Sequence, residues 1–178
     1  MIGEDYIFID VPKCATSSVI QQLKSRGSYT GPIHDHIPLK SYIDIYGLDF
    51  IKSKTVFSVV RHPLDRIYSL WKYYNKLKHS YHEIDPSIPT AKYDNHRVAV
   101  LKYLEHVTTF DQHVERICKW KEKKDYLNII RGADELPYSD VIHRGMWNML
   151  KPEGLINYVL RFEHLNEDWK EFCKIMKW

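Results

Sequence analysis

The pattern of hydrophobic and polar positions predicts strands and helices in alternation along the chain. Two short runs, residues 6–11 and 54–60, are apolar or β-branched, as buried strands are, and a third strand is predicted over 156–162. Between them, apolar residues recur at the three- and four-residue spacing of a helix. Strands that alternate with helices commonly form parallel sheets. The pattern therefore predicts an α/β layer fold with a central, mainly parallel sheet flanked by helices.

In the first half of the chain, the predicted helices begin and end at glycine and proline. A helix over 16–26 stops at Gly27, and a second helix opens at Pro38 and closes at Gly47. Pro63 opens a third helix, because proline is favoured in a first helical turn. Its apolar residues at helical spacing are Leu64, Ile67, Tyr68, Trp71, Tyr74 and Leu77.

In the second half of the chain, helices are predicted over 96–106 and 110–123, and a short strand over 126–130. Thr109 and Gln112 have the spacing of a capping box at the start of the second of these helices. A last helix is expected to be capped by Asn166. Its apolar face carries Trp169, Phe172, Cys173 and Met176.

Length and composition limit the class of protein. The 178 residues, of which 44% are hydrophobic and 28% charged, suit one soluble domain over 1–178. A net charge of only +3 does not favour a nucleic-acid partner. Three widely spaced cysteines predict neither a zinc ribbon nor a disulfide framework, and no run approaches the roughly 18 apolar residues of a membrane span. We therefore expect a cytoplasmic protein, of open oligomeric state.

Residues 78–95 contain two prolines and no clean period, so we expect a lid or an excursion beside the acceptor substrate. Tyr81 and His82 lie in this segment and are candidates to contact the acceptor. Trp71 and Tyr74 fit the core face of the preceding helix better.

Residues 12–18, PKCATSS, have the composition of an anion-binding loop between a strand and a helix. A helix N-terminus presents unpaired N–H groups and a partial positive charge. The hydroxyls of Thr16, Ser17 and Ser18 would add donors, and Lys13 a full charge. The alternative is a buried strand followed by an ordinary Ser/Thr cap. The lysine precedes the turn, so the loop does not match the phosphate-binding pattern G-x-x-x-x-G-K-[ST].

The loop resembles the 5′-phosphosulfate loop of sulfotransferases, which runs like PKSGTTW or PKTGGTS. On this resemblance Lys13 is the catalytic lysine. The residues that would bind the donor are Lys13, Cys14, Ala15, Thr16, Ser17 and Ser18. Ala15 departs from the family, which usually has glycine there. Alanine is disfavoured if the turn requires a positive φ.

A second element, RHPLDRIYS, resembles the part of sulfotransferases that binds the 3′-phosphate of the donor. There the strand-end arginine, Arg61 here, offers a planar fork of donors, and the serine, Ser69 here, closes the site. Arg66 shares a helix face with Ser69. For Arg66 we expect a structural pairing with Asp65 or Asp10.

A third similarity lies in residues 156–169, where the predicted strand ends in a Phe-Glu-x-Leu stretch. Glu163 in this stretch is expected to be structural, or to orient a neighbouring base. Similarity thus touches the start, the middle and the end of the chain.

The resemblance implies a single P-loop-like domain that moves a sulfuryl group from 3′-phosphoadenosine 5′-phosphosulfate (PAPS) to an acceptor hydroxyl. The product is adenosine 3′,5′-bisphosphate (PAP), and the implied acceptor is a carbohydrate or small metabolite. Transfer would be in-line and would need no metal, with Lys13 stabilising the leaving oxygen. The alternatives are a non-catalytic module for nucleotides or sulfated glycans, and a phosphotransferase.

Four histidines are candidates for the base that takes the acceptor's proton: His34, His36, His62 and His143. Histidine suits this role because its pKa lies near neutrality. Related sulfotransferases place a histidine where His36 lies, or late in the chain like His143, so we expect His36 first and His143 second. The alternatives are ordinary surface histidines, or a metal pair formed by His34 and His36, which lacks obvious further ligands.

Overall fold

The computed structural model describes residues 1–25, 27, 29, 36–80, 104–122 and 146–178. The sequence predicts one domain, and the chain divides into two compact units. The first unit joins Met1–His62 to Arg144–Trp178, and the second is Pro63–His143. The strand predicted over 126–130, the segment 81–95 and most of the helix predicted over 96–106 lie outside the described residues.

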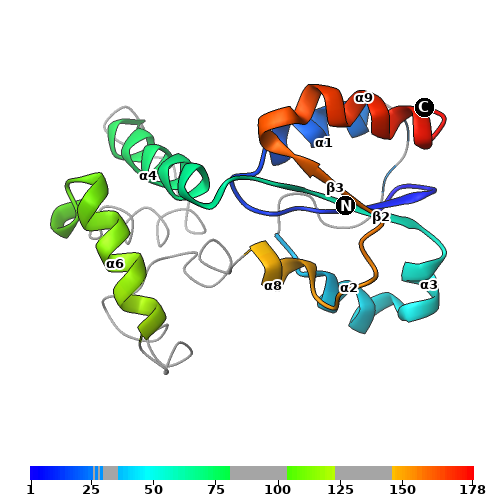
Figure 1. Ribbon diagram of the computed structural model, residues 1–178, viewed down its shortest axis with the longest axis horizontal. Helices are drawn as coiled ribbons and strands as arrows, with labels where there is room; N and C mark the ends of the chain where they lie inside the picture. The colour runs from blue at the N-terminus through cyan, green and yellow to red at the C-terminus, as the bar shows by residue number, and fades with distance from the viewer. Residues whose placement is uncertain (26, 28, 30–35, 81–103, 123–145) are drawn as a thin grey trace, which may run out of the picture. The chain divides into compact units, whose positions relative to one another are not determined.

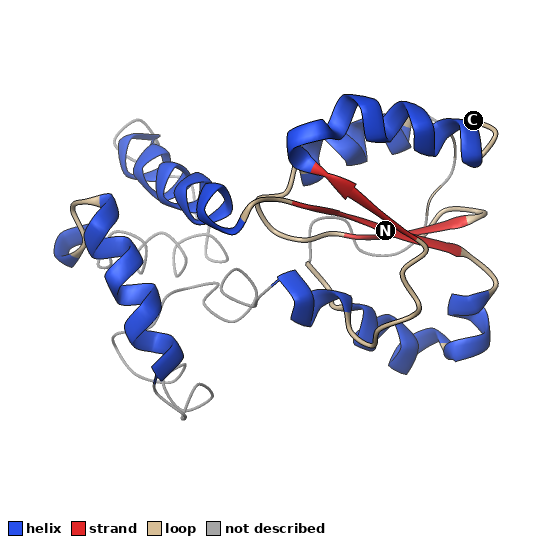
Figure 2. Ribbon diagram, in the orientation of Figure 1, coloured by secondary structure: helices blue, strands red, loops and turns tan. Residues whose placement is uncertain are grey.

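The first unit contains a parallel sheet of three strands in the order β1-β2-β3 (Figure 2). The strands are β1 (Tyr6–Ile9), β2 (Thr55–Val60) and β3 (Tyr158–Arg161). Ile9 pairs with Ser58, and Val60 pairs with Arg161. The predicted α/β class with a parallel sheet is therefore confirmed, although each strand is shorter than predicted. Because the strands are parallel, their carboxyl ends meet at one edge of the sheet.

Helices cover both faces of this sheet (Figure 1). The helices α1 (Thr16–Lys24) and α9 (Leu165–Ile175) lie on one face. The helices α2 (Leu39–Tyr46), α3 (Leu48–Lys52) and α8 (Met146–Leu150) lie on the other. This double coverage explains why β1 is buried at all four of its residues and reads as an unbroken apolar run.

Several predicted helix ends are confirmed, and others are not. Pro38 and Gly47 flank α2 as expected. The short helix α3 was not predicted, because its five residues are too few to show a period. The predicted cap at Asn166 is wrong. The chain passes through a 3₁₀ turn, Phe162–His164, and His164 caps α9, so Asn166 lies inside the helix.

Aromatic side chains fill the space between the sheet and α9. The ring centroids of Phe57 and Phe172 lie 4.4 Å apart, and both side chains are almost fully buried. Trp169 packs beside them, at 5.9 Å from Phe172. The face predicted for the last helix therefore packs against the sheet.

The second unit contains α4 (Pro63–Ser80) and α6 (Phe110–Glu122). Thr109 and Gln112 form the predicted capping box: Gln112 N donates to Thr109 Oγ1 at 3.2 Å, and Thr109 N donates to Gln112 Oε1 at 3.2 Å. The core of this unit is formed by Leu70, Tyr74, Leu104 and Val107, with Trp71 and Tyr73 packed against them.

The core face of α4 differs from the predicted one. Leu64 and Tyr68 were expected to face the core, and they are 59% and 43% exposed. Tyr74 is buried as predicted, and the other buried side chains described on α4 are Arg66 and Leu70, which precede it at intervals of one helical turn. No helix among the described residues is long and apolar enough to cross a membrane.

Candidate functional site

The loop that follows β1 makes a tight turn with two left-handed residues. Lys13 has a φ of 64° and Ala15 a φ of 59°. Between them, Cys14 N donates to Val11 O at 3.3 Å. The turn therefore does require a positive φ at Ala15, the position where the resembling family usually has glycine. A left-handed alanine costs on the order of 1 kcal/mol, and the rest of the fold must hold it.

The loop delivers the chain to the N-terminus of α1. The first bond of the helix runs from Val19 N to Ala15 O at 3.1 Å. The N–H groups of Thr16, Ser17 and Ser18 precede this bond and so have no partner within the helix. Ser17 and Ser18 are exposed, so the start of α1 is open to an anion on that side.

Two of the predicted donor-binding side chains have structural contacts instead. Thr16 Oγ1 donates to the Asp10 carboxylate and lies 3.1 Å from Val11 O, so its hydrogen is directed into the protein. Cys14 is 1% exposed, and its Sγ lies 3.8 Å from Met146 Sδ. Thr16 could thus reach an anion through its backbone N–H, whereas Cys14 N already donates to Val11 O.

Arg61 follows the last residue of β2 and lies beside the loop. Its Nη1 donates to Lys13 O at 3.4 Å, and its Cζ lies 4.0 Å from the ring centroid of Phe162. Its Nε is buried and has no hydrogen-bond partner among the described residues. Since buried polar groups are nearly always paired, this donor is a group that an anion could satisfy.

Met146 and Phe162 complete the surroundings of Arg61 and were not predicted. Met146 Sδ accepts from Arg61 N at 3.5 Å as well as contacting Cys14. The first residue of α8 thus joins the loop to the end of β2. No sequence signal marked Met146, whereas Phe162 stood in the Phe-Glu-x-Leu stretch already noted.

Glu163 holds the carboxyl ends of two strands together. His62 N donates to Glu163 Oε1 at 2.7 Å. This backbone hydrogen bond is the main reason that the pKa of Glu163 is lowered, and the nearby charge of Arg61 contributes. The contact supports the structural role expected for Glu163. His62 is exposed at this position.

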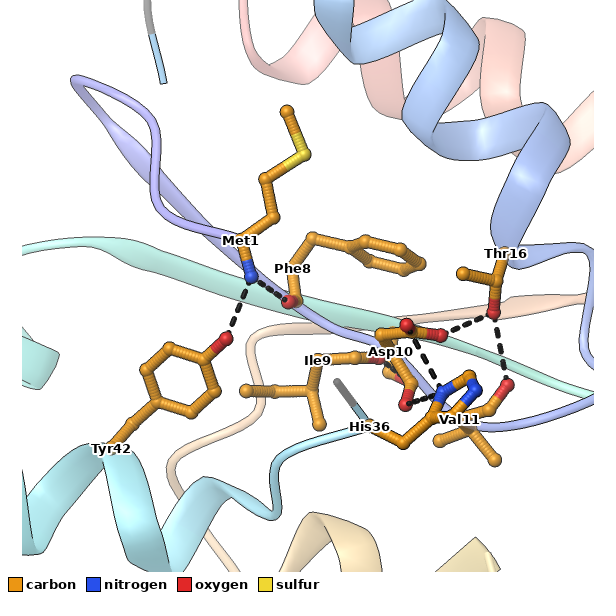
Figure 3. A network of polar contacts seen from close by, with 9 residues as sticks. Met1, Phe8, Ile9, Asp10, Val11, Thr16, His36 and Tyr42 are labelled. Carbon is orange, nitrogen blue, oxygen red and sulfur yellow. Dashed lines mark hydrogen bonds and ion pairs between the residues drawn. The ribbon is translucent and has the colours of Figure 1, made fainter. Parts of the chain in front are cut away.

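His36 lies against the carboxyl end of β1 and faces Asp10 (Figure 3). Its Nδ1 lies 3.0 Å from Asp10 Oδ2 and 3.3 Å from the Asp10 backbone oxygen. Asp10 is only 5% exposed. The partnership of His36 with Asp10 was not predicted, but an acid inside the apolar run YIFIDV was a visible signal for a paired carboxylate.

The other predicted site residues are not brought into this arrangement. Ser69 lies on α4 in the second unit, and its role at the 3′-phosphate stays a prediction. His34, His143, Tyr81 and His82 lie outside the described residues.

The carboxyl edge of the sheet therefore collects the Lys13 loop, the open start of α1, Arg61 and His36. Ligands of open parallel sheets bind at this edge. A lysine, an arginine and free helix N–H groups favour an anion, and a histidine beside them offers proton transfer. Within the described part of the chain, no group of three or more His, Cys, Asp or Glu side chains is arranged to hold a metal ion.

Comparison with known proteins gave no match to a family, to a curated protein or to a solved structure.

Proposed function

We propose that this protein is a PAPS-dependent sulfotransferase with a P-loop-like fold. The observation that carries the proposal is the contact between Arg61 Nη1 and Lys13 O at 3.4 Å. Lys13 belongs to the segment that resembles the 5′-phosphosulfate loop, and Arg61 to the segment that resembles the 3′-phosphate element. Their proximity supports one site for a donor that carries both phosphates.

In the proposed site, the N–H groups at the start of α1 bind the 5′-phosphosulfate, and Arg61 binds the 3′-phosphate. Lys13 stabilises the charge that develops on the leaving phosphate oxygen. His36 takes the proton of an acceptor hydroxyl, on a carbohydrate or a small metabolite. These roles rely on positioning and charge, so the proposed transfer requires no metal.

The test compares Lys13→Ala with Lys52→Ala, an exposed lysine in α3. Transfer of radiolabelled sulfate from PAPS would be measured against a panel of glycans, phenols and small alcohols, and PAP binding by calorimetry. We expect Lys13→Ala to abolish transfer while its circular dichroism stays that of the wild type. Lys52→Ala should keep wild-type activity. Full transfer by Lys13→Ala would contradict the mechanism.

Other outcomes would identify the alternatives. Tight PAP binding without transfer to any acceptor would favour a non-catalytic nucleotide-binding module. Magnesium-dependent transfer of phosphate from ATP would favour a phosphotransferase. A wild-type protein that binds neither PAP nor PAPS would overturn the proposal at its first step.

A further inference from the structure

We propose that Asp10 positions His36 and sets its tautomer for proton abstraction, an inference that rests on the proposed function. The two side chains come from segments that are distant in sequence. Asp10 directly follows β1, and His36 precedes α2. Asp10 would act through His36 and would not touch the substrate, so it is a positioning residue.

The surroundings of Nδ1 identify where the imidazole carries its hydrogen. Nδ1 of His36 lies 3.0 Å from Asp10 Oδ2, the distance of an ion pair, and makes its hydrogen bond to the Asp10 backbone oxygen at 3.3 Å. Asp10 Oδ2 itself has no hydrogen-bond partner among the described residues. A carboxylate and a carbonyl are acceptors only, so they favour the neutral tautomer that carries its hydrogen on Nδ1. The lone pair then sits on Nε2, which leaves that nitrogen as the base.

The Asp10 carboxylate is itself held in place on its other side. Thr16 Oγ1 donates to Asp10 Oδ1, and Oδ2 faces His36 (Figure 3). The side chain of Asp10 is 7% exposed, whereas that of His36 is 20% exposed. A buried carboxylate fixed by Thr16 thus faces a histidine that reaches the surface. A buried acid that presents itself to an accessible base is the arrangement that orients imidazoles in acyl-transfer enzymes.

Backbone strain gathers at the same edge of the sheet. His36 has a φ of 49°, and Lys13 and Ala15 are also left-handed. Among the described residues these are three of the four non-glycine residues with a positive φ. Left-handed conformations cost on the order of 1 kcal/mol each and persist where the surroundings impose them, often at functional sites.

The acceptor oxygen attacks the sulfur of PAPS, and an S–O bond forms as the bond from sulfur to the 5′-phosphate oxygen breaks. The leaving electron pair stays on that phosphate, which gives PAP. The acceptor's hydroxyl proton moves to His36 Nε2, and the Asp10 carboxylate compensates the charge of the imidazolium until the proton passes to water.

The alternative is that Asp10 only fastens the loop through Thr16. The two roles make different predictions for the imidazole. The tautomer of His36 can be read by ¹⁵N NMR of histidine-labelled protein above the pH at which the ring is protonated, with His36→Gln assigning the signal. We expect the hydrogen on Nδ1 in the wild type.

Asp10→Asn can place a donating amide where Oδ2 lies, 3.0 Å from Nδ1, while the backbone oxygen remains an acceptor, so the fraction of rings with the hydrogen on Nδ1 should fall. In this variant kcat should fall about 100-fold, with the KM for PAPS little changed. Thr16→Val removes only the other contact of Asp10, and the hydrogen should stay on Nδ1. A Thr16→Val variant that shifts the tautomer as Asp10→Asn does would overturn the inference, because Asp10 would then act through the loop.

A wild-type His36 with its hydrogen on Nε2 would overturn the inference without any variant, even in a protein that transfers sulfate. The opposite result is equally distinct. A hydrogen on Nδ1 that depends on Asp10, in a protein that transfers nothing from PAPS, would uphold the pairing and overturn the proposed function.

Discussion

The guanidinium of Arg61 donates to the backbone oxygen of Lys13, although 48 residues separate the two in sequence. Arg61 directly follows β2 and Lys13 follows β1, and the two strands are adjacent and parallel. The contact therefore follows from the register of the sheet. It brings two cationic residues to one place, which a fold alone does not require.

Arg61→Lys should weaken PAP binding by tenfold or more, about 1.4 kcal/mol or above. Lysine keeps the charge but loses the planar fork of donors and the stacking on Phe162. Calorimetric titration with PAP measures the effect. Arg161→Lys is the matched control, because Arg161 ends the neighbouring strand β3 and pairs with Asp168 instead. If both variants bind PAP as the wild type does, Arg61 is not a phosphate ligand.

Ala15→Gly should raise the free energy of unfolding by about 0.5–1 kcal/mol. Relief of the left-handed alanine contributes about 1–2 kcal/mol, and the greater freedom of glycine in the unfolded chain offsets part of it. Urea denaturation measures the difference. Gln21→Gly, at an exposed position inside α1, should have the opposite sign. Equal destabilisation by both variants would mean that Ala15 is not strained.

His113 should make the protein less stable in mild acid. Burial lowers its pKa from 6.5 to about 4. Between these values the unfolded chain binds more protons than the folded one. The contribution of neutral His113 to the free energy of unfolding is thus complete above pH 6.5. It is lost as the pH falls toward 4, by up to about 1.4 kcal/mol per pH unit.

Urea denaturation between pH 4 and 7 would test this, with His113→Phe compared with the wild type. The phenyl ring fills a similar space and does not titrate, so the dependence on pH should become shallower. His106→Gln is the control, because it removes a histidine from the surface. An unchanged pH dependence in His113→Phe would contradict the prediction.

The pair of Arg161 and Asp168 should stabilise the junction of β3 and α9. Arg161 donates to Asp168 through Nη2 at 2.7 Å, Nε at 3.0 Å and its backbone N at 2.7 Å. These bonds lower the pKa of Asp168 from 3.8 to about 2. Because the folded pKa is the lower one, the contribution is present above about pH 4 and lost as the pH falls toward 2.

Asp168→Asn should lower the free energy of unfolding at pH 7 by about 1 kcal/mol, since solvent screens the exposed arginine. Asp44→Asn breaks the exposed pair with Lys40 in α2 and should cost almost nothing. Urea denaturation of the two variants in parallel checks the difference. Equal and negligible costs would show that the bidentate geometry adds no stability.

Features that depend on neighbouring residues were predicted well from the sequence. The capping box of Thr109 and Gln112 involves residues three apart, and both of its hydrogen bonds form. The ends of α2 at Pro38 and Gly47 likewise depend on the conformations open to those two residues. The cap of α9 was missed because a 3₁₀ turn, held by its contact with the end of β2, moved the helix start ahead of Asn166.

The face of α4 shows where periodicity reaches its limit. Leu64 and Tyr68 have the spacing of a core stripe and are exposed, whereas Arg66 is buried. Several stripes on an 18-residue helix satisfy the same period, and the residues packed against the helix select among them. Hydrophobicity predicted Trp71 and Tyr74 correctly but missed Arg66, because arginine reads as polar while much of its side chain is apolar.

The sequence by itself determined the three strands, the alternation with helices, and a lysine-led loop of small and hydroxylated residues before a helix. These are local properties, which depend on runs of similar residues and on the spacing of apolar residues along the chain. Only the tertiary structure decided that Ala15 is left-handed, that Thr16 turns its hydroxyl to Asp10, and that Asp10 faces His36. The reason is physical. Which distant side chains meet depends on the parallel register of β1 and β2 and on the path of the chain between them, and no local pattern encodes either.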